Sequence, residues 1–208
     1  MGRLLVLAGP NGSGKSSIAG ALLRQHGGDY FNPDEVARAM ADLDPLLDVR
    51  EANSRAWREG VRLLVEAIAS GRDFNLETTL GGQTITRLLR DAIAGGTSVV
   101  VWYVALATPE LHVTRVKARV AEGGHDIPED DIRRRCDASR LNLIDLMPGL
   151  TVLKVFDNSK HADIAGGEAP DPQLLLHMER GRIVALCDLA TAPEWAKPIL
   201  AAALAIDV

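Results

Sequence analysis

A glycine-rich segment near the N-terminus constrains the fold of this chain most strongly. Residues 9–16 read Gly-Pro-Asn-Gly-Ser-Gly-Lys-Ser, fit the pattern G-x-x-x-x-G-K-[ST], and directly follow the apolar run from Leu4 to Ala8. When a buried strand feeds such a loop and a helix follows it, backbone N–H groups and the helix N-terminus surround phosphate oxygens. The sequence therefore predicts a P-loop fold that binds ATP or GTP together with Mg²⁺.

Residue types within the loop predict separate roles. Lys15 is expected to reach the β- and γ-phosphates, and Ser16 to offer its hydroxyl to Mg²⁺. The glycines let the backbone turn tightly and approach the phosphates. The predicted nucleotide-binding residues are Gly9, Asn11, Gly12, Ser13, Gly14, Lys15, Ser16 and Ser17.

Length and charge limit the other possibilities. The 208 residues, 47% of them hydrophobic, fit a single domain over 1–208 with a core at 1–160 and a C-terminal extension at 166–208. A net charge of -5 opposes nucleic acid as the principal ligand. The first strand leaves no room for a signal peptide, Val99–Ala107 is too short to span a bilayer, and the two cysteines form no C-x-x-C pattern. These features predict a cytoplasmic protein without a membrane partner.

Strand and helix signals alternate along the chain. The predicted strands span 4–8, 29–31, 73–77, 97–106 and 150–156. The predicted helices span 16–25, 49–69, 83–94, 109–121, 127–146 and 193–206. Another helix is expected to start at Asn32-Pro33, with Asn32 as its cap and Pro33 in its first position. This order predicts an α/β three-layer sandwich of the nucleotide-kinase type with a parallel sheet. A helical lid is expected over about 109–146 with Gly123-Gly124 as its hinge, and a small β-hairpin over 174–187.

Polar residues follow the second and third predicted strands, where an open α/β sheet binds its ligands. They are Asn32-Pro33-Asp34-Glu35 and Glu77-Thr78-Thr79. Phosphoryl transfer needs a carboxylate that orients or deprotonates the acceptor hydroxyl, so these segments are predicted to form the acceptor site, with Asn32, Glu77, Thr78 and Thr79 binding substrate. In the alternative interpretation, Asp34 and Glu35 are acids that favour a helix N-terminus, and Glu77 is a solvated carboxylate.

Arginines gather in the predicted lid. Arg115 and Arg119 share one helical face, and Arg133, Arg134 and Arg135 are consecutive. At least one of them is predicted to contact the transferred phosphoryl group. The alternative is a solvated helix face, because each of the three consecutive arginines has an acidic residue four positions before it.

The ordered combination of these segments resembles the zeta toxin-like P-loop kinases. The resemblance rests on Gly9–Ser16, Asn32–Glu35, Phe74–Leu80, the 115–119 helix followed by Gly-Gly-His-Asp-Ile-Pro, and Phe156–Ser159. It implies that Asp34 is the catalytic base, that Glu77 and Thr79 contact substrate, and that a separate antitoxin is a partner. It also implies phosphate-clamping arginines among Arg119, Arg133, Arg134 and Arg135, of which Arg119 and Arg134 are assigned as catalytic with Lys15.

Classical zeta toxins phosphorylate UDP-N-acetylglucosamine, so the resemblance implies a kinase that acts on a hydroxyl of a sugar nucleotide. This chain is compact, and its Phe31-Asn32-Pro33-Asp34 segment differs from the aspartate context of the large toxins. The resemblance therefore supports kinase chemistry better than a particular acceptor. The alternatives are a phosphotransferase for another metabolite or an antibiotic, and a nucleotide-dependent switch module that is not a kinase.

Overall fold

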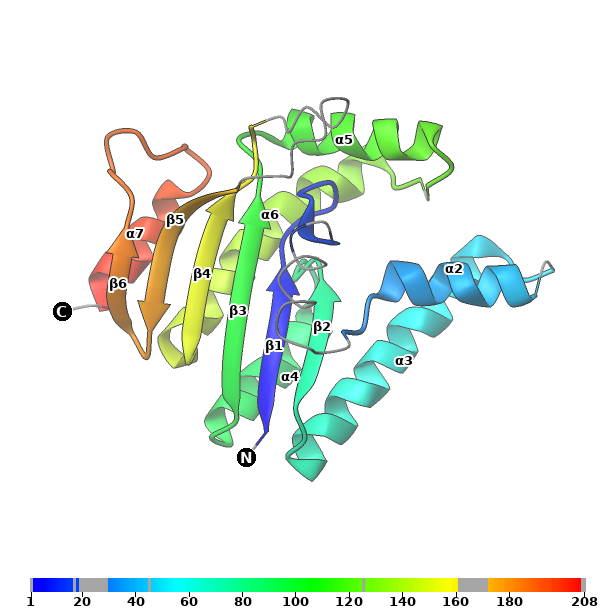
Figure 1. Cartoon of the computed structure of the whole chain (residues 1–208), viewed down its shortest axis with the longest axis horizontal. Helices are drawn as coiled ribbons and strands as arrows, with labels where there is room; N and C mark the ends of the chain where they lie inside the picture. The colour runs from blue at the N-terminus through cyan, green and yellow to red at the C-terminus, as the bar shows by residue number, and fades with distance from the viewer. Residues whose placement is uncertain are drawn as a thin grey trace.

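A six-stranded sheet organises the molecule (Figure 1). The computed structural model describes residues 2–16, 18, 30–44, 46–124, 126–160 and 172–206. The strands run in the order β2-β1-β3-β4-β5-β6, in which the first four are parallel and the last two are antiparallel to their neighbours. Their bounds are β1 Arg3–Ala8, β2 Phe74–Thr78, β3 Ser98–Ala105, β4 Val152–Asp157, β5 Gln173–Glu179 and β6 Arg182–Leu186.

Helices connect and cover these strands. They are α2 Pro33–Leu43, α3 Val49–Ser70, α4 Gln83–Ala94, α5 Pro109–Ala121, α6 Glu129–Leu146 and α7 Lys197–Ile206, with a 3₁₀ turn at Met147–Gly149. In Figure 1, α4 and α6 lie behind the sheet and α5 lies across the carboxyl ends of the strands. The described residues contain no helix that is both long and apolar enough to cross a membrane.

Both faces of the central strands are buried, as their continuous apolar sequences predict. Along β1, Leu4 and Val6 join the main hydrophobic core formed with α3, α4, α6 and α7. Leu5 and Leu7 point to the other face, where they form a second cluster with Ile18 and Val104. The alternation shows that the sheet is an inner layer of the molecule.

The parallel sheet and the C-terminal hairpin are both confirmed, and the hairpin adds two antiparallel strands to the edge of that sheet. Residues Arg180 and Gly181 connect β5 to β6 and have φ values of 49° and 81°, the positive values that a tight two-residue hairpin loop requires. The hairpin pairs antiparallel to β4 and therefore extends the main sheet. A two-residue loop can reverse a strand but cannot make the crossover that a parallel pair needs.

Most of the other predicted elements agree with the structure to within a few residues. The strand predicted at 29–31 is reduced to one bridge between Phe31 and Leu76, with Asp29 outside the described residues. Most of the helix predicted at 16–25 also lies outside them. The helix predicted from Pro193 begins at Lys197.

The predicted lid consists of two helices with different attachments. Val113 and Val116 of α5 share a small hydrophobic cluster with Ile127 and Ile132. Further along α6, Leu143 belongs to the main core. The first half of α6 therefore packs with α5, whereas its second half is anchored behind the sheet.

Candidate active site

The glycine-rich loop has the backbone geometry of a phosphate-binding loop. Gly9, Gly12 and Gly14 have φ values of 137°, 77° and 85°, which residues with side chains rarely adopt. A Cβ atom on Gly9 would lie 1.9 Å from the carbonyl oxygen of Val104, so this loop passes directly over β3. Only glycine allows that approach.

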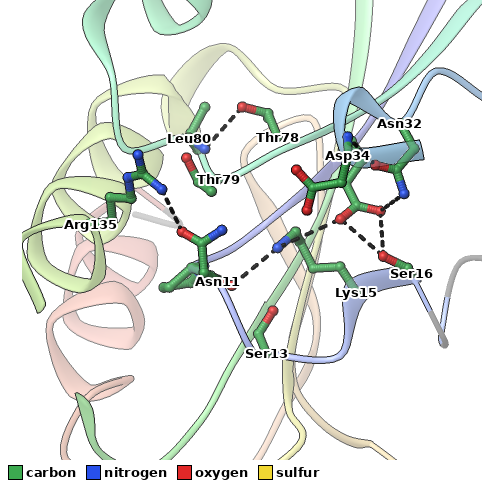
Figure 2. Close-up of polar contacts among 12 residues, drawn as sticks. Asn11, Ser13, Lys15, Ser16, Asn32, Asp34, Thr78, Thr79, Leu80 and Arg135 are labelled. Atoms are coloured by element: carbon green, nitrogen blue, oxygen red, sulfur yellow. Dashed lines mark hydrogen bonds and ion pairs between the residues drawn. The ribbon is translucent and has the colours of Figure 1, made fainter. Parts of the chain in front are cut away.

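Lys15 forms a buried charge pair below the loop. Its Nζ lies 3.8 Å from Oε1 of Glu77 and donates a hydrogen bond to the carbonyl oxygen of Pro10 at 3.1 Å (Figure 2). Burial lowers the pKa of the Lys15 ammonium and raises the pKa of the Glu77 carboxyl, while their mutual attraction opposes both shifts. A buried ammonium in such a loop is suited to an anionic ligand.

Glu77 also contacts Ser16 and Asn32. The Ser16 hydroxyl lies 3.0 and 3.2 Å from the two carboxylate oxygens, and Nδ2 of Asn32 donates to Oε2 at 3.4 Å. The adjacent parallel strands produce this arrangement, because Leu7 of β1 is in register with Glu77 of β2. The structure therefore places Glu77 under the phosphate-binding loop, beside Lys15 and Ser16, although it also lines the cleft.

The side chains of Asn32, Thr78 and Thr79 accept hydrogen bonds from nearby backbone amides. Oδ1 of Asn32 accepts a hydrogen bond from the Asp34 amide at 3.0 Å and caps α2, as predicted. The hydroxyl of Thr78 accepts from the Leu80 amide at 3.1 Å, and that of Thr79 from the Gly81 amide at 3.4 Å. These side chains hold the loops that border the cleft.

Asp34 meets a lid arginine across the cleft. Its Oδ2 lies 3.6 Å from Nη1 of Arg119, with 47% and 39% of the two side chains exposed. Asp34 stands at the start of α2, and Arg119 lies in the last turn of α5. The pair brings together a candidate base and a candidate phosphate-binding cation.

The other predicted arginines separate into two groups. Arg133 pairs with Glu110 and Glu129 at 2.5 and 2.7 Å, and Arg134 pairs with Asp131 at 2.6 Å. Nη1 of Arg135 instead donates to Oδ1 of Asn11 at 2.9 Å. Arg134 lines the cleft but is 69% exposed, so the geometry favours Arg119 and Arg135 over Arg134 as phosphate contacts.

Sequence reasoning assigned no role to His112, which is buried beside the loop. One ring nitrogen, Nδ1, lies 2.8 Å from the carbonyl oxygen of Asn11, and the other, Nε2, accepts from the Leu106 amide at 3.1 Å. Nδ1 therefore carries the proton and donates to Asn11. Burial lowers the pKa of His112 to about 4. This neutral histidine ties α5 to the phosphate-binding loop.

Asn158 lies in the Phe156–Ser159 segment noted in the sequence, but sequence reasoning assigned it no role. Nδ2 of its side chain donates to the backbone carbonyl oxygen of Ser13 at 2.9 Å. The backbone carbonyl oxygen of Asn158 accepts a hydrogen bond from Nη2 of Arg115 at 2.8 Å. Its position directly after β4 was the available signal, because ligand-binding loops of open α/β sheets follow the strands. Ser17, also predicted to bind nucleotide, lies outside the described residues.

All of these elements border one cleft with a cavity volume of about 1360 Å³. Its lining comes from the phosphate-binding loop, the end of β2, the cleft-facing sides of α2 and α3, and the α5–α6 pair. Small-molecule sites commonly enclose about 300–1,000 Å³. The cleft therefore has room for a nucleotide and a second small molecule.

Comparisons of sequence identify relatives of the chain. A family model described as an AAA domain matches residues 4–138. An uncharacterized protein of Haemophilus influenzae is 31% identical over 139 residues, covering 64% of this chain and 91% of that protein. The shikimate kinase of Legionella pneumophila strain Corby is 31% identical over 100 residues, covering 47% of this chain and 55% of the enzyme. The chain thus spans about half the length of this second relative.

Solved structures share the fold at low sequence identity. The AvrRxo1-ORF1:AvrRxo1-ORF2 complex with ATP gives a TM-score of 0.67 at 17% identity, covering 98% of this chain and 64% of the other. The PezAT toxin-antitoxin system of Streptococcus pneumoniae gives a TM-score of 0.54 at 18% identity, covering 76% and 68%. These matches agree with the α/β P-loop, kinase-like architecture described above.

Proposed function

The chain belongs to the AAA-domain family, and from this premise we propose that it is an ATP- or GTP-dependent kinase that phosphorylates a hydroxyl group of a small molecule. One observation carries the proposal. The buried Lys15–Glu77 pair and Ser16 lie at one end of a cleft that also presents Asp34 and Arg119. The cleft thus combines a phosphate-binding loop with a carboxylate and a cation for phosphoryl transfer.

The oxygen donors beside Lys15 fit Mg²⁺. The Ser16 hydroxyl and the Glu77 carboxylate are oxygen ligands of the kind that Mg²⁺ prefers. The two oxygens lie 3.0 Å apart, close enough to contact the same ion. Ser16 and Glu77 would hold the ion, which would offset charge on the β- and γ-phosphates when bound. We extend the role of Glu77 accordingly, from an acceptor contact to a residue that also organises the phosphate end of the cleft.

Asp34 is the proposed base and Arg119 its partner in the reaction. The Asp34 carboxylate orients the acceptor hydroxyl and takes its proton, while the oxygen attacks the γ-phosphorus and the bond to the β-phosphate oxygen breaks. Arg119 and Arg135 then offset negative charge on the transferred group. Lys15 does the same from the loop side.

For the acceptor, we propose a sugar nucleotide such as UDP-N-acetylglucosamine. The resemblance of the sequence motifs to zeta toxins supports this assignment, as does the fold shared with the PezAT toxin-antitoxin system. On the same basis we propose a separate antitoxin protein as a partner. A second candidate is a cyclic metabolite, which the 31% identity to shikimate kinase over 100 residues favours.

The test is a transfer assay with a mixed pool of acceptors. The protein is incubated with Mg-ATP or Mg-GTP and a pool of nucleotide sugars and cyclic metabolites, and mass spectrometry identifies any compound that gains one phosphoryl group. Lys15→Ala is expected to abolish phosphorylation of the acceptor without changing the circular dichroism spectrum of the protein. Hydrolysis of nucleotide without a phosphorylated product would instead favour the switch module.

A further inference from the structure

Helix α3 exposes a tryptophan on its cleft side. Trp57 is 46% exposed, which is unusual for so large an apolar side chain. It shares a stripe of α3 with Arg50, Asn53, Ser54 and Val61, at the spacings of three and four residues that place side chains on one helix face. All five residues line the cleft.

The solvent-facing side of α3 has a different chemistry. Glu51 pairs with Arg55 at 2.8 Å, and Arg62 pairs with Glu59 at 2.7 Å and with Glu66 at 3.0 Å. Such ion pairs are typical of a solvated helix surface. Trp57 lies outside this charged stripe, so its exposed surface is part of the cleft wall.

An apolar floor continues from Trp57 toward the reacting groups. A Cβ atom on Gly60 would lie 2.6 Å from Cε1 of Phe31, so the absence of a side chain at Gly60 brings α3 directly against that ring. Phe31 also packs against Phe74, with ring centroids 6.4 Å apart. Phe31 and Leu76 line the cleft together with Trp57. Phe31 and Leu76 both precede polar residues of the site along the chain. Asp34 comes three residues after Phe31, and Glu77 directly follows Leu76.

We propose that Trp57 is the platform on which the acceptor stacks, and that the acceptor is therefore a cyclic alcohol with one apolar ring face. This inference rests on the proposed kinase function. Stacking of a tryptophan ring on a flat ligand face contributes favourable binding free energy, because it removes apolar surface of both partners from water. The tryptophan side chain loses little conformational freedom in doing so. An open-chain polyol offers no such face.

The steady-state test compares ring and open-chain acceptors in matched variants. Transfer from Mg-ATP is measured for UDP-N-acetylglucosamine, N-acetylglucosamine, shikimate and glycerol in wild type, Trp57→Ala and Val65→Ala. Val65 is an exposed residue of the same helix outside the cleft lining. Trp57→Ala is expected to raise KM for the ring acceptor by about 5- to 100-fold, the usual range for a lost stacking contact, with kcat and nucleotide affinity nearly unchanged.

Fluorescence gives a readout that does not require turnover. Titration with each acceptor, and with UDP alone, is expected to change tryptophan emission in wild type and to leave emission unchanged in Trp57→Phe, which keeps an aromatic ring. A response to UDP assigns stacking to the nucleobase, and a response to N-acetylglucosamine or shikimate assigns it to the acceptor ring; the second result supports the proposal.

Three outcomes overturn the inference. One is an unchanged KM in Trp57→Ala, the second is preferred phosphorylation of glycerol, and the third is emission that responds to UDP but to no acceptor ring. Each leaves the kinase proposal standing if a phosphorylated product forms. Absence of transfer to any acceptor, with no change in Trp57 emission, would overturn both.

Discussion

Two carboxylates of the site have different surroundings, and these surroundings separate their proposed roles. Glu77 is 9% exposed and contacts Lys15, Ser16 and Asn32, so its oxygens are already engaged at the phosphate end of the cleft. Asp34 is half-exposed, and its carboxylate pairs with the partly exposed Arg119 at 3.6 Å. An acceptor hydroxyl can reach Asp34 without breaking a buried contact, which favours Asp34 as the base.

Replacing Asp34 by asparagine tests that role. The amide keeps the size of the side chain but cannot take a proton at neutral pH, so single-turnover transfer should fall by roughly 10²–10⁴-fold. Loss of the half-exposed ion pair with Arg119 should cost less than about 1 kcal/mol of stability. Nucleotide affinity should barely change, and Glu35→Gln, the neighbouring control, should be much milder. A fully active Asp34→Asn protein would show that Asp34 only stabilises the N-terminus of α2.

His112 predicts a specific pH dependence of stability. Its pKa is lowered to about 4 in the folded protein, against about 6.5 in an unfolded chain, so the unfolded state binds the proton more readily between these values. The free energy of unfolding is therefore unaffected by this group above about pH 6.5 and decreases as pH falls toward 4. At about 1.4 kcal/mol per pH unit, the loss approaches about 3 kcal/mol.

Chemical denaturation between pH 4 and 7 measures this slope. His112→Gln does not titrate and should show a shallower decrease over the same range. Equal slopes in the two proteins would mean that His112 is not held neutral by its contacts with Asn11 and Leu106.

Helices α5 and α6 present their arginines to different surroundings. The first half of α6 packs on α5 through Ile132, which turns Arg133 toward Glu110 of α5 and leaves Arg135 beside the glycine-rich loop. Gly81 has no side chain where Arg135 passes, and a Cβ atom there would lie 3.0 Å from Cγ of Arg135. Arg133 therefore makes ion pairs at the surface, whereas Arg135, two residues later in the same helix, lies at the cleft.

Single alanine substitutions of four arginines should therefore have unequal effects. Arg119→Ala and Arg135→Ala should each lower kcat by roughly 10²–10³-fold, as expected when a cation that stabilises the transition state is removed. Arg133→Ala and Arg134→Ala, the matched controls, should lose only a few tenths of a kcal/mol of stability and keep near-normal kcat. Normal turnover in all four variants would contradict a role for these helices in catalysis.

At the scale of the whole molecule, the C-terminal segment completes the core. Leu175 and Leu176 of β5 and Ile199 of α7 belong to the same hydrophobic core as β1 and β3. Nε1 of Trp195 also donates to Oδ2 of Asp157 at 3.0 Å, next to the residue that holds the glycine-rich loop. We therefore expect this segment to unfold together with the part of the molecule that carries the glycine-rich loop.

A pair of substitutions on α7 tests this cooperativity. Ile199 is completely buried, and Ile199→Ala should lower the free energy of unfolding by about 2–5 kcal/mol through lost burial and a residual cavity. Leu204 is 42% exposed, and Leu204→Ala should cost much less. Thermal unfolding of both variants, followed by circular dichroism, should remain a single transition. Similar melting temperatures for the two would show that α7 is not part of the cooperative core.

Local sequence patterns predicted most of the secondary structure and the phosphate-binding loop. These features depend on local physics: apolar runs that form buried strands, Asn32 as a helix cap, and glycines that permit positive φ values in Gly9–Ser16. Asp34, Glu77 and Thr79, which come after strand signals in the sequence, line the cleft, because parallel strands end at one edge of the sheet.

Which of these residues contact one another depends on long-range packing that local patterns do not contain. The register between β1 and β2 put Glu77 beside Ser16, and the packing of α6 on α5 separated Arg135 from Arg133. The antiparallel addition of β5 to β4 and the position of Trp57 on the cleft wall likewise depend on partners distant in sequence. Periodicity gives the face on which a side chain lies, but the neighbour opposite that face is chosen by long-range packing.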